Sequence, residues 1–179
     1  MAERLLLDAC VLYPSVLREV LLGVAQRGVF VPLWSPRILA EWAHAAARRG
    51  DDAGPAVARA AAAFPGAEVQ PQDGVEATLS LPDPGDAHVL AAALAGGAEA
   101  IITLNLRDFP ARSLAALGLR AEAPDTLLMR LWLAHPAAVE DAVAQAVTRA
   151  EAIAGTARPV RALLKRAGLP RLGKALGAS

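Results

Sequence analysis

The sequence has few of the residues that mark an extracellular, membrane or cysteine-metal protein. It has one cysteine, Cys10, which excludes an intrachain disulfide framework and a Cys-rich zinc site. No apolar run approaches the roughly 18 to 20 residues of a membrane-spanning helix. The longest, 89–103, is interrupted by Gly96, Gly97 and Glu99. The N-terminus lacks the long apolar region of a secretory signal. We therefore expect a cytoplasmic protein that does not associate with membranes.

Aromatic residues are also scarce, at 4% of the chain, whereas alanine occurs 43 times. This alanine content raises the mean hydropathy without creating a membrane segment. The chain has enough Leu and Val to bury a core of ordinary globular size, which argues against disorder. A length of 179 residues predicts about one domain.

The net charge is zero, but the charges are unevenly distributed along the chain. Residues 1–110 carry 8 Arg against 13 acids, a balance of −5, and residues 111–179 have a balance of +5. Between Arg158 and Lys174 six basic residues occur with no acid. Such a segment suits contact with nucleic acid, and a solvated helical face beside an acidic partner explains so short a run about as well.

Short apolar runs alternate with helical stripes. Strands are expected at 4–8, 29–33, 100–104 and 119–121. Helices are expected at 14–26, 35–49, 55–64, from 83 or 85 to 96, and at 111–117, 124–134, 136–154 and 159–167. Strands that alternate with helices predict a mostly parallel α/β sheet, here with additional helices at the C-terminal end.

Four carboxylates fall near the predicted carboxyl edge of this sheet, where open parallel sheets bind ligands. Asp8 ends the first strand, and Asp108 lies in the loop after 100–104. Asp86 opens the preceding helix, and Glu41 lies among apolar neighbours, either at the edge of the stripe or aimed at a positive group. A single such acid is commonly a cap or a surface charge. Four converging acids repel one another unless a cation neutralises them.

Oxygen ligands without cysteine favour Mg²⁺ or Mn²⁺ over Zn²⁺. These ions bridge phosphate oxygens and promote phosphodiester hydrolysis with one or two metals. The acidic pattern therefore indicates a metal-dependent enzyme that acts on phosphodiesters.

The segments LLLDACVLYP, RILAEW and LPDPGDAHVLAAALAGGAEAIITLNLRDFP resemble the PIN-domain nucleases, especially the VapC-like ribonuclease toxins of bacterial toxin–antitoxin pairs. The similarity covers about 5–125. It implies a PIN-like three-layer fold with a mostly parallel central sheet flanked by helices, in a nuclease domain over 1–125. A helical extension over 126–179 is expected to pack on the same domain. The resemblance further implies a Mg²⁺- or Mn²⁺-dependent endoribonuclease that cleaves RNA, binds a cognate antitoxin and forms a homodimer.

Matched motif by motif, the resemblance assigns the family's metal-binding and catalytic positions to Asp8, Glu41, Asp86 and Asp108. Secondary positions near the metal fall on Thr103 and Asn105, and Asp83 is a further candidate that suits a turn or a cap better. Candidates for holding the RNA backbone are Arg37, Arg107 and Arg112, and for each an ordinary surface position is the more frequent explanation.

The chain departs from the family at Ala9 and Cys10, where a hydroxyl residue and then an Asn are usual. This departure leaves open a PIN-fold module that binds RNA or protein with weak or no cleavage. Because related folds cut DNA, a DNA nuclease is a further alternative. Cys10 itself is expected to be a small buried residue of an extended strand, and His88 is expected to serve packing or to lie at the surface.

One motif is misleading. Residues 168–174 read G-x-x-x-x-G-K, the beginning of a phosphate-binding loop. Ala175 stands where Ser or Thr would reach Mg²⁺, and no strand is expected before Gly168. Nucleotide hydrolysis is therefore not expected.

Overall fold

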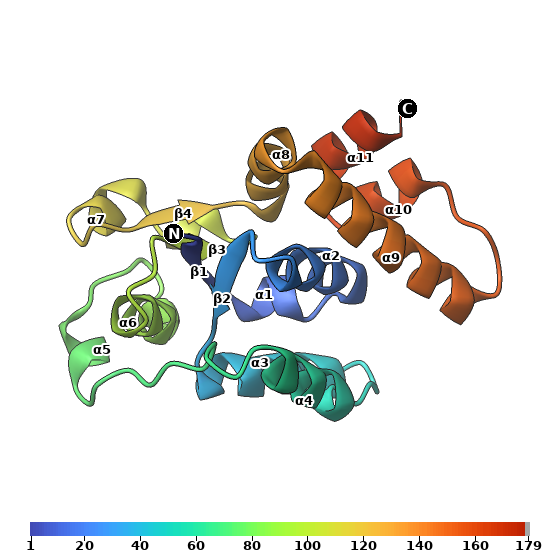
Figure 1. Cartoon of the computed structure of the whole chain (residues 1–179). Helices are drawn as coiled ribbons and strands as arrows, with labels where there is room; N and C mark the ends of the chain where they lie inside the picture. Colours follow the sequence, from blue (N-terminus) through green and yellow to red (C-terminus); the bar gives the residue numbers. More distant parts are fainter. Residues whose placement is uncertain (178–179) are drawn as a thin grey trace. The chain divides into compact units, whose positions relative to one another are not determined.

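A computed structural model describes residues 1–177 of the chain, which divide into two compact units (Figure 1). Unit 1 consists of 1–13 and 30–122. Unit 2 consists of 14–29 and the C-terminal segment that begins at Ala123. The predicted boundary between 125 and 126 remains a prediction, as does the packing of the extension on the nuclease domain.

Unit 1 contains a four-stranded sheet in which all neighbouring strands are parallel. The strands are β1 (Glu3–Leu7), β2 (Phe30–Leu33), β3 (Ala100–Ile102) and β4 (Arg120–Glu122), in the order β2-β1-β3-β4. Leu7 pairs with Ile102, so β1 and β3 end side by side. The predicted parallel α/β fold is confirmed, and the switch in strand order lies between β1 and β3.

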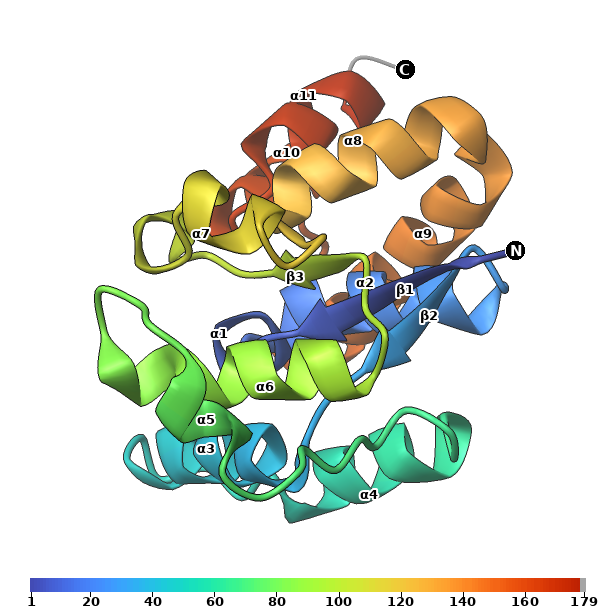
Figure 2. The same ribbon diagram turned by 90° about the vertical axis from the view of Figure 1, so that its left-hand side faces the viewer.

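Helices of unit 1 flank this sheet, some directly and some by packing on other helices (Figure 2). They are α1 (Ala9–Leu12), α3 (Pro36–Ala47), α4 (Gly54–Ala63), α5 (Val75–Thr78), α6 (Ala87–Ala95) and α7 (Ala111–Ala115), with the 3-10 turns η1 (Pro84–Asp86) and η2 (Leu106–Asp108). Helix α6 packs on β1 and β3, and its residues 87–93 are all buried. Small side chains such as Ala92 allow this close approach, so the alanine content serves packing here.

Unit 2 is helical. It contains α2 (Ser15–Gln26), α8 (Pro124–Ala134), α9 (Pro136–Ala154), α10 (Val160–Arg166) and α11 (Pro170–Leu176). Helix α2 packs closely on α9, where a Cβ on Gly23 would lie 3.1 Å from that of Ala142. Both carboxylate oxygens of the buried Asp125 accept hydrogen bonds from the first turn of α11, at 2.9 Å from the Arg171 N–H and 3.1 Å from the Leu172 N–H.

The glycines of the misleading motif have structural roles. Gly168 follows α10 with a φ of +81°, a conformation that favours glycine. A Cβ on Gly173 would lie 3.1 Å from the Arg161 carbonyl oxygen, so this glycine allows α11 to pack against α10. Helix α10, and not a strand, therefore precedes residues 168–174, as expected for a segment that is not a phosphate-binding loop.

Three short helices were not predicted, namely α1, α5 and α11. Each has four to seven residues, which is too short for a 3.6-residue period to stand out. Consequently β1 ends at Leu7 rather than at Asp8, and Asp8 is the N-cap of α1. Among the described residues no helix is both long and apolar enough to cross a membrane.

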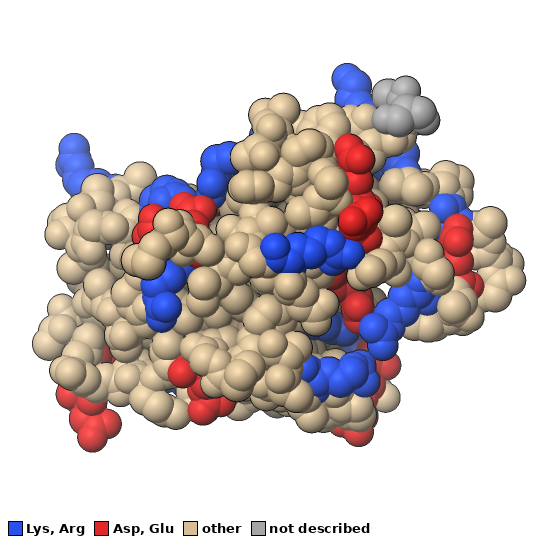
Figure 3. Space-filling view, viewed as in Figure 1, with Lys and Arg blue, Asp and Glu red and all other residues tan. Residues whose placement is uncertain are grey.

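The uneven distribution of charge along the sequence does not produce a uniformly positive or negative face in Figure 3. On the face drawn in Figure 3, Lys and Arg are interspersed with Asp and Glu among uncharged residues. The acid-free basic segment forms α10, α11 and their flanks, where Arg161, Lys165, Arg166, Arg171 and Lys174 are exposed and Arg158 is half-buried.

Candidate active site

The candidate site is centred on Asp8, at the end of β1 beside the end of β3. The Asp8 N–H donates to the Ile102 carbonyl at 3.1 Å, which continues the β1–β3 ladder by one residue. The Asp8 side chain is buried, with 7% exposure. Its Oδ1 accepts from the Ala9 N–H at 2.7 Å and so caps α1. The carboxylate is thus fixed at the switch point of the sheet, where ligands of such folds bind.

Thr103 holds the other oxygen of this carboxylate. Its hydroxyl donates to Asp8 Oδ2 at 2.8 Å and accepts from the Asn105 N–H at 3.1 Å. Thr103 is completely buried, whereas Asn105 is exposed and reaches this network through its backbone. The structure therefore places Thr103 directly against Asp8 and places the Asn105 side chain farther out.

Cys10 also belongs to the site, which corrects the expectation of a small buried strand residue. It lies half-buried on α1, and its thiol donates to Asp8 Oδ2 at 3.3 Å. The same sulfur accepts from the Leu104 N–H at 3.3 Å. Burial, followed by the charge of Asp8, raises the pKa of the Cys10 thiol to about 12. The thiol therefore stays protonated at neutral pH and acts as a hydrogen-bond donor to Asp8.

Glu41 approaches the site from α3. This helix begins at Pro36 after Ser35, whose hydroxyl accepts from the Ile38 N–H at 3.2 Å. Glu41 lies at the edge of the apolar stripe and is 41% exposed. Burial raises its pKa, the Arg37 guanidinium lowers it, and the charges of Asp8 and Asp86 raise it further. Glu41 therefore interacts electrostatically with two other carboxylates of the predicted set, Asp8 and Asp86.

Asp86 and Asp108 lie on the two 3-10 turns and are half-buried. The pKa of Asp86 is raised to about 6 by burial, then by the charges of Asp8, Asp83 and Asp108. Asp83 has the predicted capping role, because its Oδ1 accepts from the Gly85 N–H at 2.8 Å. All four predicted carboxylates therefore lie within electrostatic range of at least one other member.

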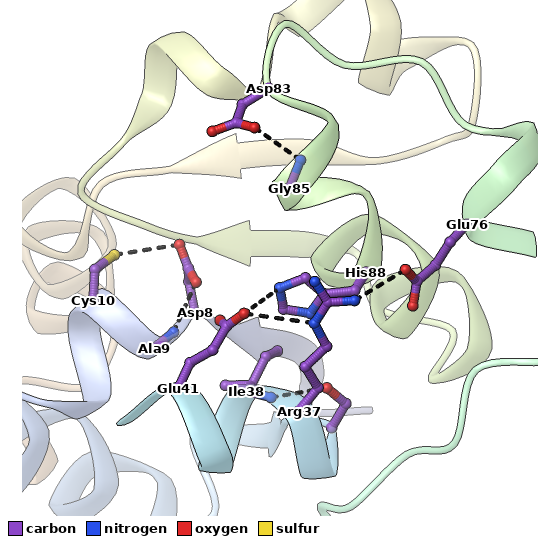
Figure 4. A network of polar contacts seen from close by, with 11 residues as sticks. Asp8, Ala9, Cys10, Arg37, Ile38, Glu41, Glu76, Asp83, Gly85 and His88 are labelled. Carbon is purple, nitrogen blue, oxygen red and sulfur yellow. Dashed lines mark hydrogen bonds and ion pairs between the residues drawn. The ribbon is translucent and has the colours of Figure 1, made fainter. Parts of the chain in front are cut away.

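His88 is buried, which agrees with the packing role expected of it, and its side chain also faces the site (Figure 4). Its Nε2 lies 2.8 Å from Glu41 Oε1. Burial lowers the pKa of His88 to about 4, with a further contribution from Arg37, so the imidazole is neutral at pH 7. Neither the spacing of His88 from Asp86 nor the helical period indicated this contact, since it joins α3 to α6.

The three arginines proposed for RNA binding differ in their surroundings. Arg37 forms ion pairs with Glu76 at 3.2 Å and Glu41 at 3.7 Å, so it is already engaged by carboxylates. Arg107 and Arg112 are exposed on η2 and α7, and neither forms an ion pair with a described residue. These two cations lie close in sequence to Asp108 and are available to a phosphate.

The donor chemistry of the site fits a hard divalent cation, because carboxylate oxygens are the ligands that Mg²⁺ and Mn²⁺ prefer. The raised pKa values of Glu41 and Asp86 arise partly from repulsion that a cation would relieve. In this conformation, however, no three His, Cys, Asp or Glu side chains within 1–177 form a group that could hold one ion. The carboxylates are thus electrostatically coupled without forming a closed ligand shell.

A parallel α/β unit with carboxylates gathered at its switch point defines a class of metal-dependent enzymes. A family model described as a PIN domain matches residues 4–107, more than half of the chain. The chain belongs to the PIN domain family, whose members are generally nucleases that depend on divalent metal ions. No curated protein and no solved structure matches the chain.

Proposed function

We propose that this protein is a Mg²⁺- or Mn²⁺-dependent endoribonuclease, with Asp8, Glu41, Asp86 and Asp108 as metal ligands. The observation that carries the proposal is the electrostatic coupling of these four carboxylates, which come from four separate segments of unit 1. Such coupling is unfavourable for the apoprotein and favourable for a protein that binds a cation there. The bound ion would supply the Lewis acidity that activates water for attack on a phosphodiester.

The protein's own residues would have distinct roles in metal and RNA binding. Thr103, Cys10 and the Ala9 N–H fix the buried Asp8, so this ligand needs little reorganisation. Glu41 and Asp86 are more exposed and can adjust when a cation binds. Arg107 and Arg112, which are exposed on η2 and α7, are suited to hold the RNA backbone.

Further parts of the proposal rest on the resemblance to VapC-like toxins. We propose that the protein is the toxin of a toxin–antitoxin pair, acts in the cytoplasm on RNA and forms a homodimer. A cognate antitoxin would then block the acidic site. A small gene beside the one encoding this chain, whose product forms a complex with it and inhibits cleavage, is the expected finding.

A second candidate function, nucleic-acid binding without cleavage, is favoured by one observation. Cys10 occupies a position where the family usually has Asn, and its thiol uses a lone pair of Asp8 that a metal ligand needs. In this alternative the site would bind RNA and cleave it slowly or not at all.

The deciding experiment is cleavage of matched single-stranded RNA and DNA by the full chain with Mg²⁺, Mn²⁺ or EDTA. We expect metal-dependent RNA cleavage that Asp8→Asn and Asp86→Asn abolish. Asp73→Asn, at an exposed position, is the matched control and should retain activity. Cleavage of DNA alone would establish a DNA nuclease. RNA binding without cleavage under all conditions would establish the second candidate, and unchanged cleavage by both Asn variants would overturn the site.

A further inference from the structure

The contact between His88 and Glu41 joins two helices that are distant in sequence. The side chains approach from α6 and α3, with Nε2 and Oε1 2.8 Å apart (Figure 4). His88 is only 3% exposed, whereas Glu41 is 41% exposed. A buried imidazole therefore supports a carboxylate that extends toward solvent.

The hydrogen-bonding pattern fixes the tautomer of His88. A neutral imidazole has one N–H, and only a nitrogen that bears hydrogen can donate to a carboxylate. The proton therefore lies on Nε2, directed at Glu41. His88 Nδ1 is buried and has no hydrogen-bond partner among the described residues. A buried polar atom without a partner is costly, which indicates that the orientation of the ring serves its other nitrogen.

Only one oxygen of Glu41 is engaged. His88 Nε2 and the Arg37 Nε, at 3.7 Å, both approach Oε1, and no described residue forms a hydrogen bond with Oε2. A carboxylate held at one oxygen keeps its second oxygen available to a ligand. Hydrogen bonds of this kind orient the carboxylates of metal sites and change metal affinity when they are lost.

We propose that His88 is a positioning residue for Glu41: its Nε2–H holds Oε1 so that Oε2 remains directed to the metal site shared with Asp8 and Asp86. This inference rests on the proposed function. It assigns two roles to the start of α6, since Asp86 provides a ligand and His88, two residues later, orients the ligand provided by α3. The different directions of the two side chains on the helix make both roles possible.

The test compares His88→Gln with His88→Asn in the full chain. The Gln amide nitrogen reaches the position of Nε2, whereas the shorter Asn amide reaches only that of Nδ1. Mn²⁺ alone is titrated by calorimetry, with no RNA present. We expect His88→Asn and His88→Ala to weaken Mn²⁺ binding by about 10-fold or more, and His88→Gln to remain within about 3-fold of the parent protein. His44→Ala, at an exposed position of α3, is the control.

A second measurement asks whether His88 acts through Glu41. In a Glu41→Gln background, His88→Asn should weaken Mn²⁺ binding no further, because the carboxylate that His88 orients has been removed. Equal Mn²⁺ affinities of the folded Gln and Asn variants would overturn the positioning role. If Asp8→Asn still loses Mn²⁺ binding in that case, the proposed metal site stands without His88. If Asp8→Asn also binds Mn²⁺ like the parent protein, the proposed function itself fails.

Discussion

The hydroxyl of Thr103 donates a 2.8 Å hydrogen bond to Oδ2 of Asp8, and both side chains are buried. The two residues are 95 positions apart and meet because β1 and β3 pair in register, with Leu7 opposite Ile102. The bond stabilises a buried carboxylate that has few other donors. It also fixes the orientation of the central carboxylate of the site.

Thr103→Val, which keeps the shape and removes the hydroxyl, should therefore affect both stability and activity. We expect a loss of about 1–2 kcal/mol in the free energy of unfolding, because a buried carboxylate loses one of its three hydrogen-bond donors. We also expect a roughly 10-fold or greater loss of metal-dependent cleavage, with recovery in Thr103→Ser. Urea unfolding and cleavage assays measure the two effects. Thr78→Val, which removes an exposed hydroxyl, is the control and should change neither stability nor cleavage. A Thr103→Val variant with full cleavage activity would contradict a role of Thr103 in orienting Asp8.

Asp86→Asn should stabilise the metal-free protein at neutral pH while removing activity. Folding raises the pKa of Asp86 from 3.8 to about 6, so the folded state binds this proton more tightly than the unfolded state. The destabilisation by the ionised form is therefore absent below the unfolded pKa and fully developed above the folded pKa. With allowance for solvent screening, we expect about 1 kcal/mol of stabilisation near pH 7.5.

Urea unfolding in EDTA at several pH values measures this effect. The extra stability of Asp86→Asn relative to the parent protein should decrease as the pH falls through about 6 and should vanish near pH 4. Asp73→Asn, at an exposed position, is the control. A variant that is less stable than the parent protein near pH 7.5 would contradict the destabilisation of ionised Asp86 by burial and by the neighbouring carboxylates.

Cys10 should react slowly with alkylating reagents in the folded protein. Its pKa of about 12 leaves very little thiolate at pH 8. An exposed cysteine with a pKa near 8.5 would react about 1000-fold faster. Mass spectrometry after timed exposure to iodoacetamide measures the rate, with the guanidinium-unfolded chain as the reference. Equal rates in the folded and unfolded protein would show that Cys10 is not held against Asp8.

Asp125→Ala should destabilise unit 2, because it removes the acceptor of two N–H groups at the start of α11. We expect a loss of about 1–3 kcal/mol. Hydrogen exchange should increase most over α11. Asp125→Asn keeps one acceptor oxygen and should have an intermediate effect. Asp141→Ala, at an exposed position of α9, is the control, and equal stability of the two Ala variants would exclude a capping role for Asp125.

Many of the elements could be predicted from the sequence because their signals are local. Helix α9 has the predicted bounds, with Pro136 in its first turn and Gly155, at positive φ, after its last residue. The caps provided by Ser35 and Asp83 also lie where expected, because each side chain contacts a backbone group within three residues. Such interactions depend on the chain immediately around them.

The sequence alone thus determined the parallel α/β class and most element positions, and it indicated the four acids that we propose as metal ligands. Only the tertiary structure decided that His88 holds Glu41 and that Cys10 and Thr103 hold Asp8. The period of a helix predicts that a residue is buried but not which residue of another helix it meets. That choice depends on how α3 and α6 are placed around the sheet and on the register of β1 with β3.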